Sequence, residues 1–218
     1  MRRNMVQALR PLGFVLLLSG ALLMGAGDAT PQSAQLRQPT TAFFLGTIAD
    51  FANGRLTVQT AEGQTLYAII NPRSKIALLK PADFGDLQEG TYIASVGKDQ
   101  GSDTIEAIEL RIVEEKLRGV GEGTRPFHGG GEDKTSTTNA KIVSVSTTVF
   151  PPEIAIRLRG RDMKIILPDN APITFMTIGD ASALKPGVPV SVFTVRSRTG
   201  STDVVRINVG QGGVVPIL

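Results

Sequence analysis

An internal repeat is the feature that most constrains what this chain can fold into. Residues 46–112 align with residues 140–209 along their whole length, although few identities remain. Three pairs of positions keep a constant separation of 97 residues: Gly63 and Gly160, Leu87 and Leu184, Gly90 and Gly187. Two glycines and a leucine kept in register over such a span indicate a duplicated structural unit. The two copies are therefore expected to share one fold.

Both copies read as β-strands. In the first copy Leu56 and Val58 alternate with polar neighbours, and in the second Ile154 and Ile156 do the same. This period of two predicts half-buried strands. The segment Thr104–Leu117 taken alone also fits an amphipathic helix. Its counterpart in the second copy alternates β-branched residues with period two, so both segments are predicted to be strands.

The turns between these strands also carry signals. Asn53-Gly54 lies between two alternating runs and predicts a type I′ hairpin turn. Pro151-Pro152 stands near the same place in the second copy, where a wider turn is expected. A Leu-x-x-Gly element precedes an apolar strand in each copy. We expect a short helical turn there, with a buried leucine at the barrel end and a glycine in the left-handed conformation.

These strands predict an all-β fold. A unit of about five strands cannot leave both sheet edges open without a risk of aggregation, and closure into a small OB-like β-barrel covers them. We expect two tandem barrels, the first repeat over residues 42–113 and the second over residues 139–210. Residues 114–138 have the composition of a flexible Gly-rich linker, and residues 211–218 are expected to form a tail.

The first 29 residues have the pattern of a signal peptide. Three arginines precede an apolar run from Leu12 to Met24, and small residues follow up to Ala29. The run is shorter than the roughly 20 residues that a spanning helix needs, so cleavage and a periplasmic or secreted protein are expected, with no integral membrane span afterwards. An uncleaved N-terminal anchor is the alternative.

Composition excludes several classes of function. Residues 1–29 hold three Arg and one Asp, so removing them from 23 basic and 20 acidic side chains leaves 20 and 19. A net charge near +1 gives no basic patch for phosphates, and no nucleic-acid partner is expected. The chain has no Cys, which excludes disulfides, thiolate metal sites and cysteine nucleophiles.

The repeats also resemble a known family. An opening strand, the strand LTVQT, a turn glycine and D-L-x-x-G before a valine-rich strand resemble a bacterial exported domain of unknown function, often found in tandem. RGVGEGTRPF, TNAKI and VGQGGVVPIL resemble its alphaproteobacterial version, so the resemblance covers about residues 46–218. It implies small OB-like β-barrels and export, and no catalytic residues. Relatives are sometimes labelled metal-transporter permeases, but one short apolar run cannot form a multi-span channel.

The single histidine, His128, limits the available chemistry. It stands among glycines, where a general base is hard to hold in place, so no enzyme activity, cofactor or metal is expected. Glu132 and Asp133 are its only nearby ligand candidates. Arg125, Phe127 and His128 form the one candidate partner-binding segment, since aromatic and Arg side chains are enriched at interface hot spots. Docking of this segment onto the chain's own barrel is the alternative that we favour.

These features predict an exported, non-enzymatic binding or scaffolding module of the periplasm or cell envelope. OB-type barrels usually bind across one face, so an unknown protein or an oligosaccharide of the envelope is the expected partner. A periplasmic metal-binding or metal-delivery protein, using His128 and the nearby carboxylates, is the alternative function.

Overall fold

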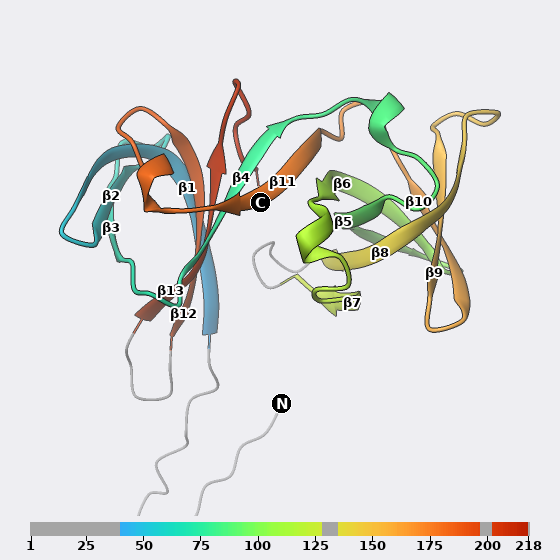
Figure 1. The fold of residues 1–218 in the computed structure, drawn as a ribbon, viewed down its shortest axis with the longest axis horizontal. Coiled ribbons are helices and arrows are strands. Elements are labelled where there is room, and N and C mark those ends of the chain that lie inside the picture. Colours follow the sequence, from blue (N-terminus) through green and yellow to red (C-terminus); the bar gives the residue numbers. More distant parts are fainter. Residues whose placement is uncertain (1–39, 128–134, 197–201, 218) are drawn as a thin grey trace, which may run out of the picture. The chain divides into compact units, whose positions relative to one another are not determined.

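The computed structural model describes residues 40–127, 135–196 and 202–217, which all belong to one compact unit, Leu36–Leu218 (Figure 1). These residues form strands and three short 3-10 helices, without an α-helix, so the predicted all-β class is confirmed. The predicted signal peptide, residues 1–29, and His128 lie outside the described residues.

The elements follow one another along the chain as follows. The strands are β1 (Thr40–Ala52), β2 (Arg55–Gln59), β3 (Thr65–Ile69), β4 (Lys75–Pro81), β5 (Tyr92–Gly101), β6 (Thr104–Val113), β7 (Gly123–Pro126), β8 (Thr135–Ser146), β9 (Glu153–Leu158), β10 (Arg161–Ile166), β11 (Ile173–Gly179), β12 (Pro189–Arg196) and β13 (Thr202–Gly210). The 3-10 helices are η1 (Phe84–Asp86), η2 (Glu115–Leu117) and η3 (Ala181–Ala183).

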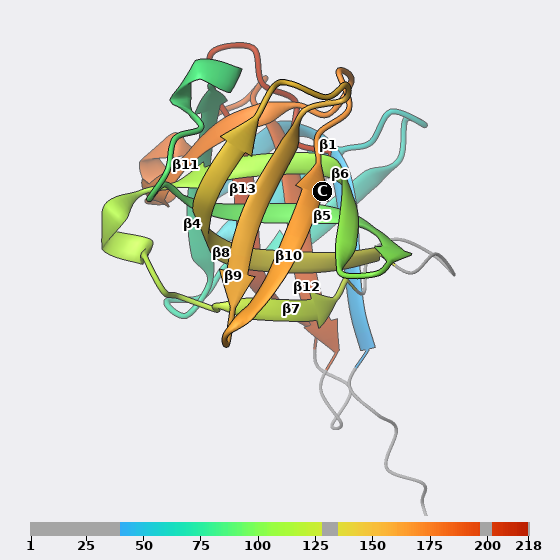
Figure 2. The ribbon, with the colours of Figure 1, turned by 90° about the vertical axis from the view of Figure 1, so that its right-hand side faces the viewer.

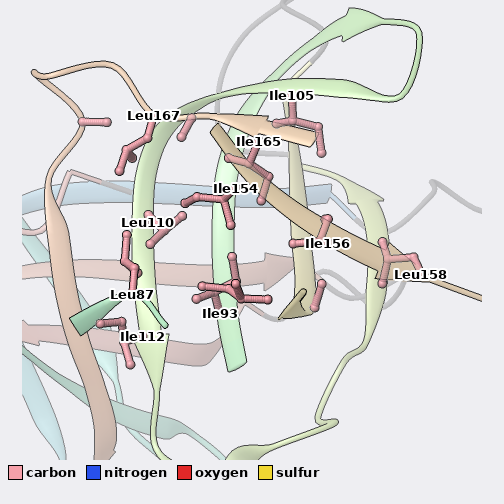
Figure 3. Packing of buried hydrophobic residues seen from close by; sticks show 14 residues of the cluster. Leu87, Ile93, Ile105, Leu110, Ile112, Ile154, Ile156, Leu158, Ile165 and Leu167 are labelled. Atoms are coloured by element: carbon pink, nitrogen blue, oxygen red, sulfur yellow. The ribbon is translucent and has the colours of Figure 1, made fainter. Parts of the chain in front are cut away.

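Five strands close into a barrel in the order β10-β9-β8-β5-β6, and Figure 2 faces this part of the fold. The barrel closes where Lys164–Ile166 of β10 pairs in parallel with Thr104–Glu106 of β6. Alternation decides the faces of β9: Ile154, Ile156 and Leu158 point inward and are buried, while their neighbours point outward. The core of this closed barrel (Figure 3) includes Leu87, Ile93, Ile105, Leu110, Ile112, Ile154, Ile156, Leu158, Ile165 and Leu167.

Seven further strands continue the same sheet beyond β6, in the order β11-β4-β13-β12-β1-β2-β3, and β7 lies off this path, paired with β8. We call β13, β12, β1, β2 and β3 the open sheet, because within the described residues no strand pairing joins β3 back to β13. The open sheet has its own core, which includes Ile48, Leu56, Val58, Val190, Val192, Val204, Ile207 and Val209. β4 and β11 lie between the open sheet and the closed barrel and pair antiparallel with each other.

This pairing differs from the expected division into one barrel per segment. The closed barrel takes β5 and β6 from residues 42–113 but β8, β9 and β10 from residues 139–210. The open sheet takes β1, β2 and β3 from the first segment but β12 and β13 from the second. Both segments have the same hydrophobic pattern. The pattern therefore predicts the strands but does not specify whether a strand pairs with one from its own segment or from the other segment.

The expected linker and tail are also more ordered than their composition suggests. Residues 114–138 contain η2, β7 and the start of β8, and β7 pairs antiparallel with β8. In the tail, the Gln211 amide donates to the Leu79 carbonyl, and Pro216 is buried. Glycine and charge content therefore indicated irregular segments here, but it did not predict their contacts with β8 and with Leu79.

Most local predictions are confirmed. Asn53 and Gly54 have φ values of 51° and 75°, as a type I′ hairpin between β1 and β2 requires. β6 is a strand as predicted, although it ends at Val113 and η2 follows. Leu87 and Leu184 are buried, each directly after a 3-10 helix. Gly90 and Gly187 have φ values of 86° and 84°, where a Cβ would be strained.

Irregular features recur at equal spacing along the chain. The 3-10 helices η1 and η3 begin at Phe84 and Ala181, which are 97 positions apart. The β5–β6 pairing shifts register between Val96 and Gly97, and the β12–β13 pairing shifts between Phe193 and Thr194, again 97 positions later. Bulges and short helices at matching places mean that the two segments bend their strands in the same way.

Candidate functional site

Two hairpins occupy corresponding places in the two halves of the fold, and their outer faces differ. In β2–β3 the outward residues pair across the strands as Arg55 with Ile69, Thr57 with Tyr67 and Gln59 with Thr65. In β9–β10 the corresponding pairs are Glu153 with Ile166, Ala155 with Lys164 and Arg157 with Asp162. The inward residues of both hairpins are apolar and mostly buried, so the outer faces carry the difference.

Ion pairs cover the β9–β10 face. Lys164 Nζ lies 2.9 Å from Glu153 Oε1, and Arg157 Nε donates to Asp162 Oδ1 at 2.5 Å. The hydrogen bond from Arg157 lowers the pKa of Asp162 below its ordinary value of 3.8, and the charge of Arg157 acts in the same direction. The same pairing raises the pKa of Arg157. The polar groups of this face are therefore already engaged with one another.

The β2–β3 face instead exposes large side chains. Tyr67 is 63% exposed and Ile69 is 62% exposed, although both lie in a regular strand. The guanidinium carbon of Arg55 lies 5.4 Å from the centroid of the Tyr67 ring, within cation–π range. Tyr and Arg are the residue types that dominate binding energy at interfaces. We define the candidate functional site as this β2–β3 face.

The β2–β3 face presents apolar, cationic and neutral hydrogen-bonding groups. Tyr67 and Ile69 offer an apolar surface, and Arg55 supplies a positive charge with several donors. Thr57, Gln59 and Thr65 add neutral hydrogen-bonding groups beside them. The six outward positions hold no carboxylate and no histidine.

The candidate segment predicted from the sequence has its contacts within the chain. Phe127 packs against Phe43 of β1 and Phe193 of β12, with ring centroids 5.9 and 6.1 Å away. Nη2 of Arg125 donates to the Gly121 carbonyl at 2.6 Å. Phe127 therefore docks onto the open sheet, which is the alternative that we favoured for this segment. His128, Glu132 and Asp133 lie outside the described residues.

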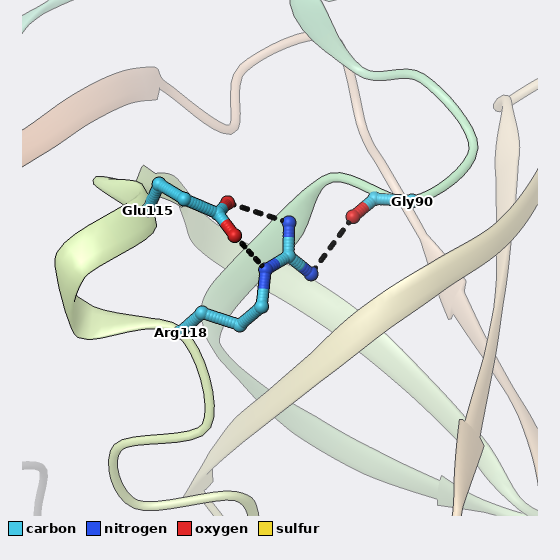
Figure 4. A network of polar contacts seen from close by, with 3 residues as sticks. All are labelled: Gly90, Glu115 and Arg118. Carbon is cyan, nitrogen blue, oxygen red and sulfur yellow. Dashed lines mark hydrogen bonds and ion pairs between the residues drawn. The ribbon is translucent and has the colours of Figure 1, made fainter.

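The segment 114–127, which we call the strap, is held against the closed barrel by Arg118 (Figure 4). Its Nε and Nη2 donate to the two carboxylate oxygens of Glu115 at 2.5 and 2.7 Å, and its Nη1 donates to the Gly90 carbonyl at 3.1 Å. The Arg118 guanidinium carbon also lies 5.9 Å from the Tyr92 ring centroid. In these contacts the charged groups of Glu115 and Arg118 hold the strap in place.

Tyr92 is a buried titratable group at the place where the strap meets the barrel. Its side chain is 4% exposed, and its hydroxyl has no hydrogen-bond partner among the described residues. Burial raises the pKa of Tyr92, and the charge of Glu122 raises it further, while Arg125 and Arg118 oppose both. A phenol whose pKa is raised stays protonated at neutral pH.

Two further places bring polar side chains together, one on β6 and one beside η3. On β6 the buried side chains of Glu109 and Arg111 form an ion pair through Oε1 and Nε. Beside η3 a hollow of about 520 Å³ is lined partly by Asp180, Lys185 and Gln211. Asp180 accepts a hydrogen bond from the Ser182 amide at 2.8 Å and so caps η3. Hydrogen bonding from the Ser182 side chain, and then from the Ser182 amide, lowers the pKa of Asp180. Ser182 lines the same hollow as Asp180 and Lys185.

Within residues 40–127, 135–196 and 202–217, no group of three or more His, Asp or Glu side chains is placed to hold a metal ion. In the same part of the chain, no helix is both long and apolar enough to cross a membrane.

Sequence reasoning missed the residues of the β2–β3 face, although a signal for them was present. The period of two already places Tyr67 and Ile69 on the outer side of their strand. Aligning LYAII with MKIIL puts Tyr67 opposite Lys164, so comparing outward positions between the two segments would have found an aromatic where the other segment has a charge. Comparison of the chain with protein-family models, with curated proteins and with solved structures finds no match.

Proposed function

We propose that this chain is a non-enzymatic binding or scaffolding module and that the β2–β3 face is its recognition surface. The observation that carries the proposal is the contrast between two corresponding hairpins. One covers its outer face with ion pairs, and the other leaves Tyr67 and Ile69 more than half exposed beside Arg55. Exposed aromatic and aliphatic side chains lose water favourably when a partner covers them, which gives such a face a reason to bind.

The proposed partner is a protein or an oligosaccharide of the cell envelope. OB-type barrels bind ligands across the outer face of their second and third strands, which is the position of this surface in the open sheet. A tyrosine ring can stack on a sugar ring or on an apolar side chain, and the threonines and glutamine beside it can exchange hydrogen bonds with hydroxyls or peptide groups. One arginine on the face is too little charge for a nucleic-acid backbone.

The location and family remain part of the same proposal. Residues 1–29 are proposed to export the chain to the periplasm or cell surface, on the basis of their charge and apolar pattern. Residues 42–113 and 139–210 are proposed to be tandem repeats of the exported family that they resemble. The 97-residue spacing of η1 and η3 and of the two register shifts supports the repeat.

The test compares the two faces directly. The purified chain is immobilised and exposed to envelope extract and to panels of envelope oligosaccharides, and the ligand that it retains is identified and titrated. The same titration is run on the variant Tyr67→Ala with Ile69→Ser. Its matched control is Lys164→Ala with Ile166→Ser, which changes the corresponding positions of β10. All of these side chains point out of their sheets, so we expect every variant to fold.

The proposal predicts that the β3 variant binds the ligand at least about tenfold more weakly, while the β10 control keeps the wild-type affinity. Equal affinity in all three proteins would show that the β2–β3 face is not the recognition surface. Failure of the wild-type chain to retain any ligand would count against a binding function altogether.

A further inference from the structure

We infer that the two proposed repeats have exchanged halves, so that each repeat needs the strands of a second copy to complete its barrel. The first repeat contributes β1, β2 and β3 to the open sheet and β5 and β6 to the closed barrel, and the second repeat contributes the complementary strands to each. This is the arrangement of a domain-swapped dimer whose two subunits are joined in one chain. The inference rests on the repeat assignment and is independent of the ligand proposed for the β2–β3 face.

The first argument is that pairings between the segments recur at equivalent positions. β1 pairs antiparallel with β12, with Thr47 opposite Pro189, and β8 pairs antiparallel with β5, with Lys141 opposite Tyr92. Tyr92 and Pro189 are 97 positions apart, as the repeat predicts. The first strand of each repeat therefore pairs with the same strand of the other repeat. This reciprocal pairing is the property of a two-fold symmetric pair.

The parallel pairings repeat in the same way. β4 pairs with β13 so that Ile76 lies opposite Ile207, and β11 pairs with β6 so that Ile173 lies opposite Leu110. Ile76 and Ile173 are 97 positions apart, and so are Leu110 and Ile207. In both cases the fourth strand of one repeat lies beside the last strand of the other repeat.

A local two-fold axis relates the two repeats where β4 and β11 meet. Leu79 lies opposite Met176, and these residues occupy the same position in their repeats. On either side of this pair, Leu78 lies opposite Thr177 and Lys80 lies opposite Phe175. An antiparallel pair of equivalent strands with an equivalent residue pair at its centre is what two-fold symmetry requires.

The segments around η1 and η3 are the points where each repeat crosses over. η1 follows β4, which pairs with β13 of the open sheet, and precedes β5 of the closed barrel. η3 follows β11, which pairs with β6 of the closed barrel, and precedes β12 of the open sheet. Leu87 follows η1 and packs into the closed barrel, while Leu184 follows η3 and packs into the core of the open sheet. Each leucine thus packs into the core to which the following strand belongs, β5 for Leu87 and β12 for Leu184.

One consequence concerns the proposed recognition surface. Its strands, β2 and β3, belong to a sheet that the second repeat completes with β12 and β13. Cutting the chain between the repeats would therefore separate β12 and β13 from the other three strands of the sheet that carries the surface. A chain with a single repeat of this kind would have to pair with a second copy to bury the same core.

The test uses disulfides in the full chain, which has no cysteine of its own. In the exchanged arrangement Glu106 of β6 lies opposite Ile166 of β10. If each repeat folded on itself, Glu106 would instead lie opposite Ile69, the position that corresponds to Ile166. Paired strands lie about 4.7–4.9 Å apart, within the Cα separation that a disulfide accepts. Arg157→Cys with Asp162→Cys links β9 to β10 in either arrangement and serves as the positive control.

We expect Glu106→Cys with Ile166→Cys to form an intramolecular cross-link in most of the monomer, seen by non-reducing electrophoresis and by mass spectrometry of the linked peptides. Glu106→Cys with Ile69→Cys should stay reduced under the same mild oxidation. A cross-link between residues 106 and 69 would overturn the inference, and so would a lack of both cross-links while the control forms. A link between residues 106 and 166 found only between two chains would show exchange with a second molecule instead of exchange within one.

Discussion

The β2–β3 and β9–β10 hairpins have similar inner sides and different outer faces. Their inward residues are apolar in both, and each hairpin packs on its own core. The β10 edge pairs with β6 and closes its barrel, whereas β3 ends the path of the open sheet. Outward, ion pairs cover one hairpin and an exposed tyrosine and isoleucine mark the other. The inward positions thus build the two cores, while the outward positions differ between the hairpins.

We expect the largest losses of unfolding free energy from matched truncations in the two cores, which test whether the cores are comparable. Leu110 in the closed barrel and Ile207 in the open sheet are fully buried and 97 positions apart. We expect Leu110→Ala and Ile207→Ala each to lower the free energy of unfolding by about 2–5 kcal/mol, because each leaves a cavity in a packed core. Urea unfolding followed by circular dichroism measures both values, and Val205→Ala, at a position 40% exposed, serves as the mild control.

Shared strands also predict how these variants unfold. Since each segment supplies strands to both cores, we expect one cooperative transition in the wild-type protein and in both variants. Two separate transitions, with Leu110→Ala shifting only one of them, would show that the closed barrel and the open sheet are independent. That result would also weaken the inference of exchanged halves.

A second comparison contrasts two phenylalanines in irregular segments. Phe127 of the strap packs against Phe43 and Phe193, whereas Phe150 in the loop between β8 and β9 is 79% exposed. We expect Phe127→Ala to cost about 1–3 kcal/mol of unfolding free energy, and Phe150→Ala to cost less than about 0.5 kcal/mol. Thermal or urea unfolding measures both. Equal small losses would mean that the strap contributes little to holding the open sheet.

Sequence patterns predicted the local structure well because local structure depends on nearby residues. The alternation of Leu56 and Val58 gives a strand wherever the chain pairs, and Asn53-Gly54 gives the hairpin turn regardless of the partner strand. The identity of the partner strand is different. β5 meets an equivalent edge whether it pairs with β1 or with β8, so the hydrophobic pattern is satisfied in both cases and cannot choose between them.

The candidate site was only partly predictable for a related reason. Period two places Tyr67 on an outer face, but the sequence does not say whether another segment covers that face. Phe127 shows the opposite outcome: on a glycine-rich segment it could meet a partner or its own chain, and it packs against Phe43 and Phe193 of its own chain. Exposure depends on tertiary contacts, and these are what the pattern of a single strand does not contain.

Double-mutant cycles sharpen the comparison of the two hairpin faces. Lys164 and Glu153 form a partly exposed ion pair, and Arg55 stacks on the exposed Tyr67 ring. We expect a coupling energy of at most about 1 kcal/mol for each pair when both members are changed to Ala singly and together. Raising the salt concentration should reduce the Lys164–Glu153 coupling more than the Arg55–Tyr67 coupling, because the tyrosine ring carries no net charge. Equal salt dependence of the two coupling energies would contradict the assignment of Arg55 and Tyr67 as a cation–π pair.

The smallest expected effect is the pH dependence of the Arg157–Asp162 pair. The pKa of Asp162 lies below its ordinary value of 3.8, chiefly because its carboxylate accepts the hydrogen bond from Arg157. A carboxyl group with a lowered pKa in the folded state stabilises the fold fully above its unfolded-state pKa, and this stabilisation is lost as the pH falls through the folded pKa. The loss therefore belongs below about pH 4.

We expect Asp162→Asn to be slightly less stable than the wild type near neutral pH and to approach it in acid, with the difference reduced by salt because the pair is exposed. Urea unfolding at a series of pH values measures this difference. Arg157→Gln provides the control, because without the guanidinium the Asp162→Asn substitution should have the same effect at every pH. A stability gap between wild type and Asp162→Asn that widened in acid would mean that Asp162 is stabilised in its protonated form, and the β9–β10 face would then not be an ion-paired counterpart of the β2–β3 face.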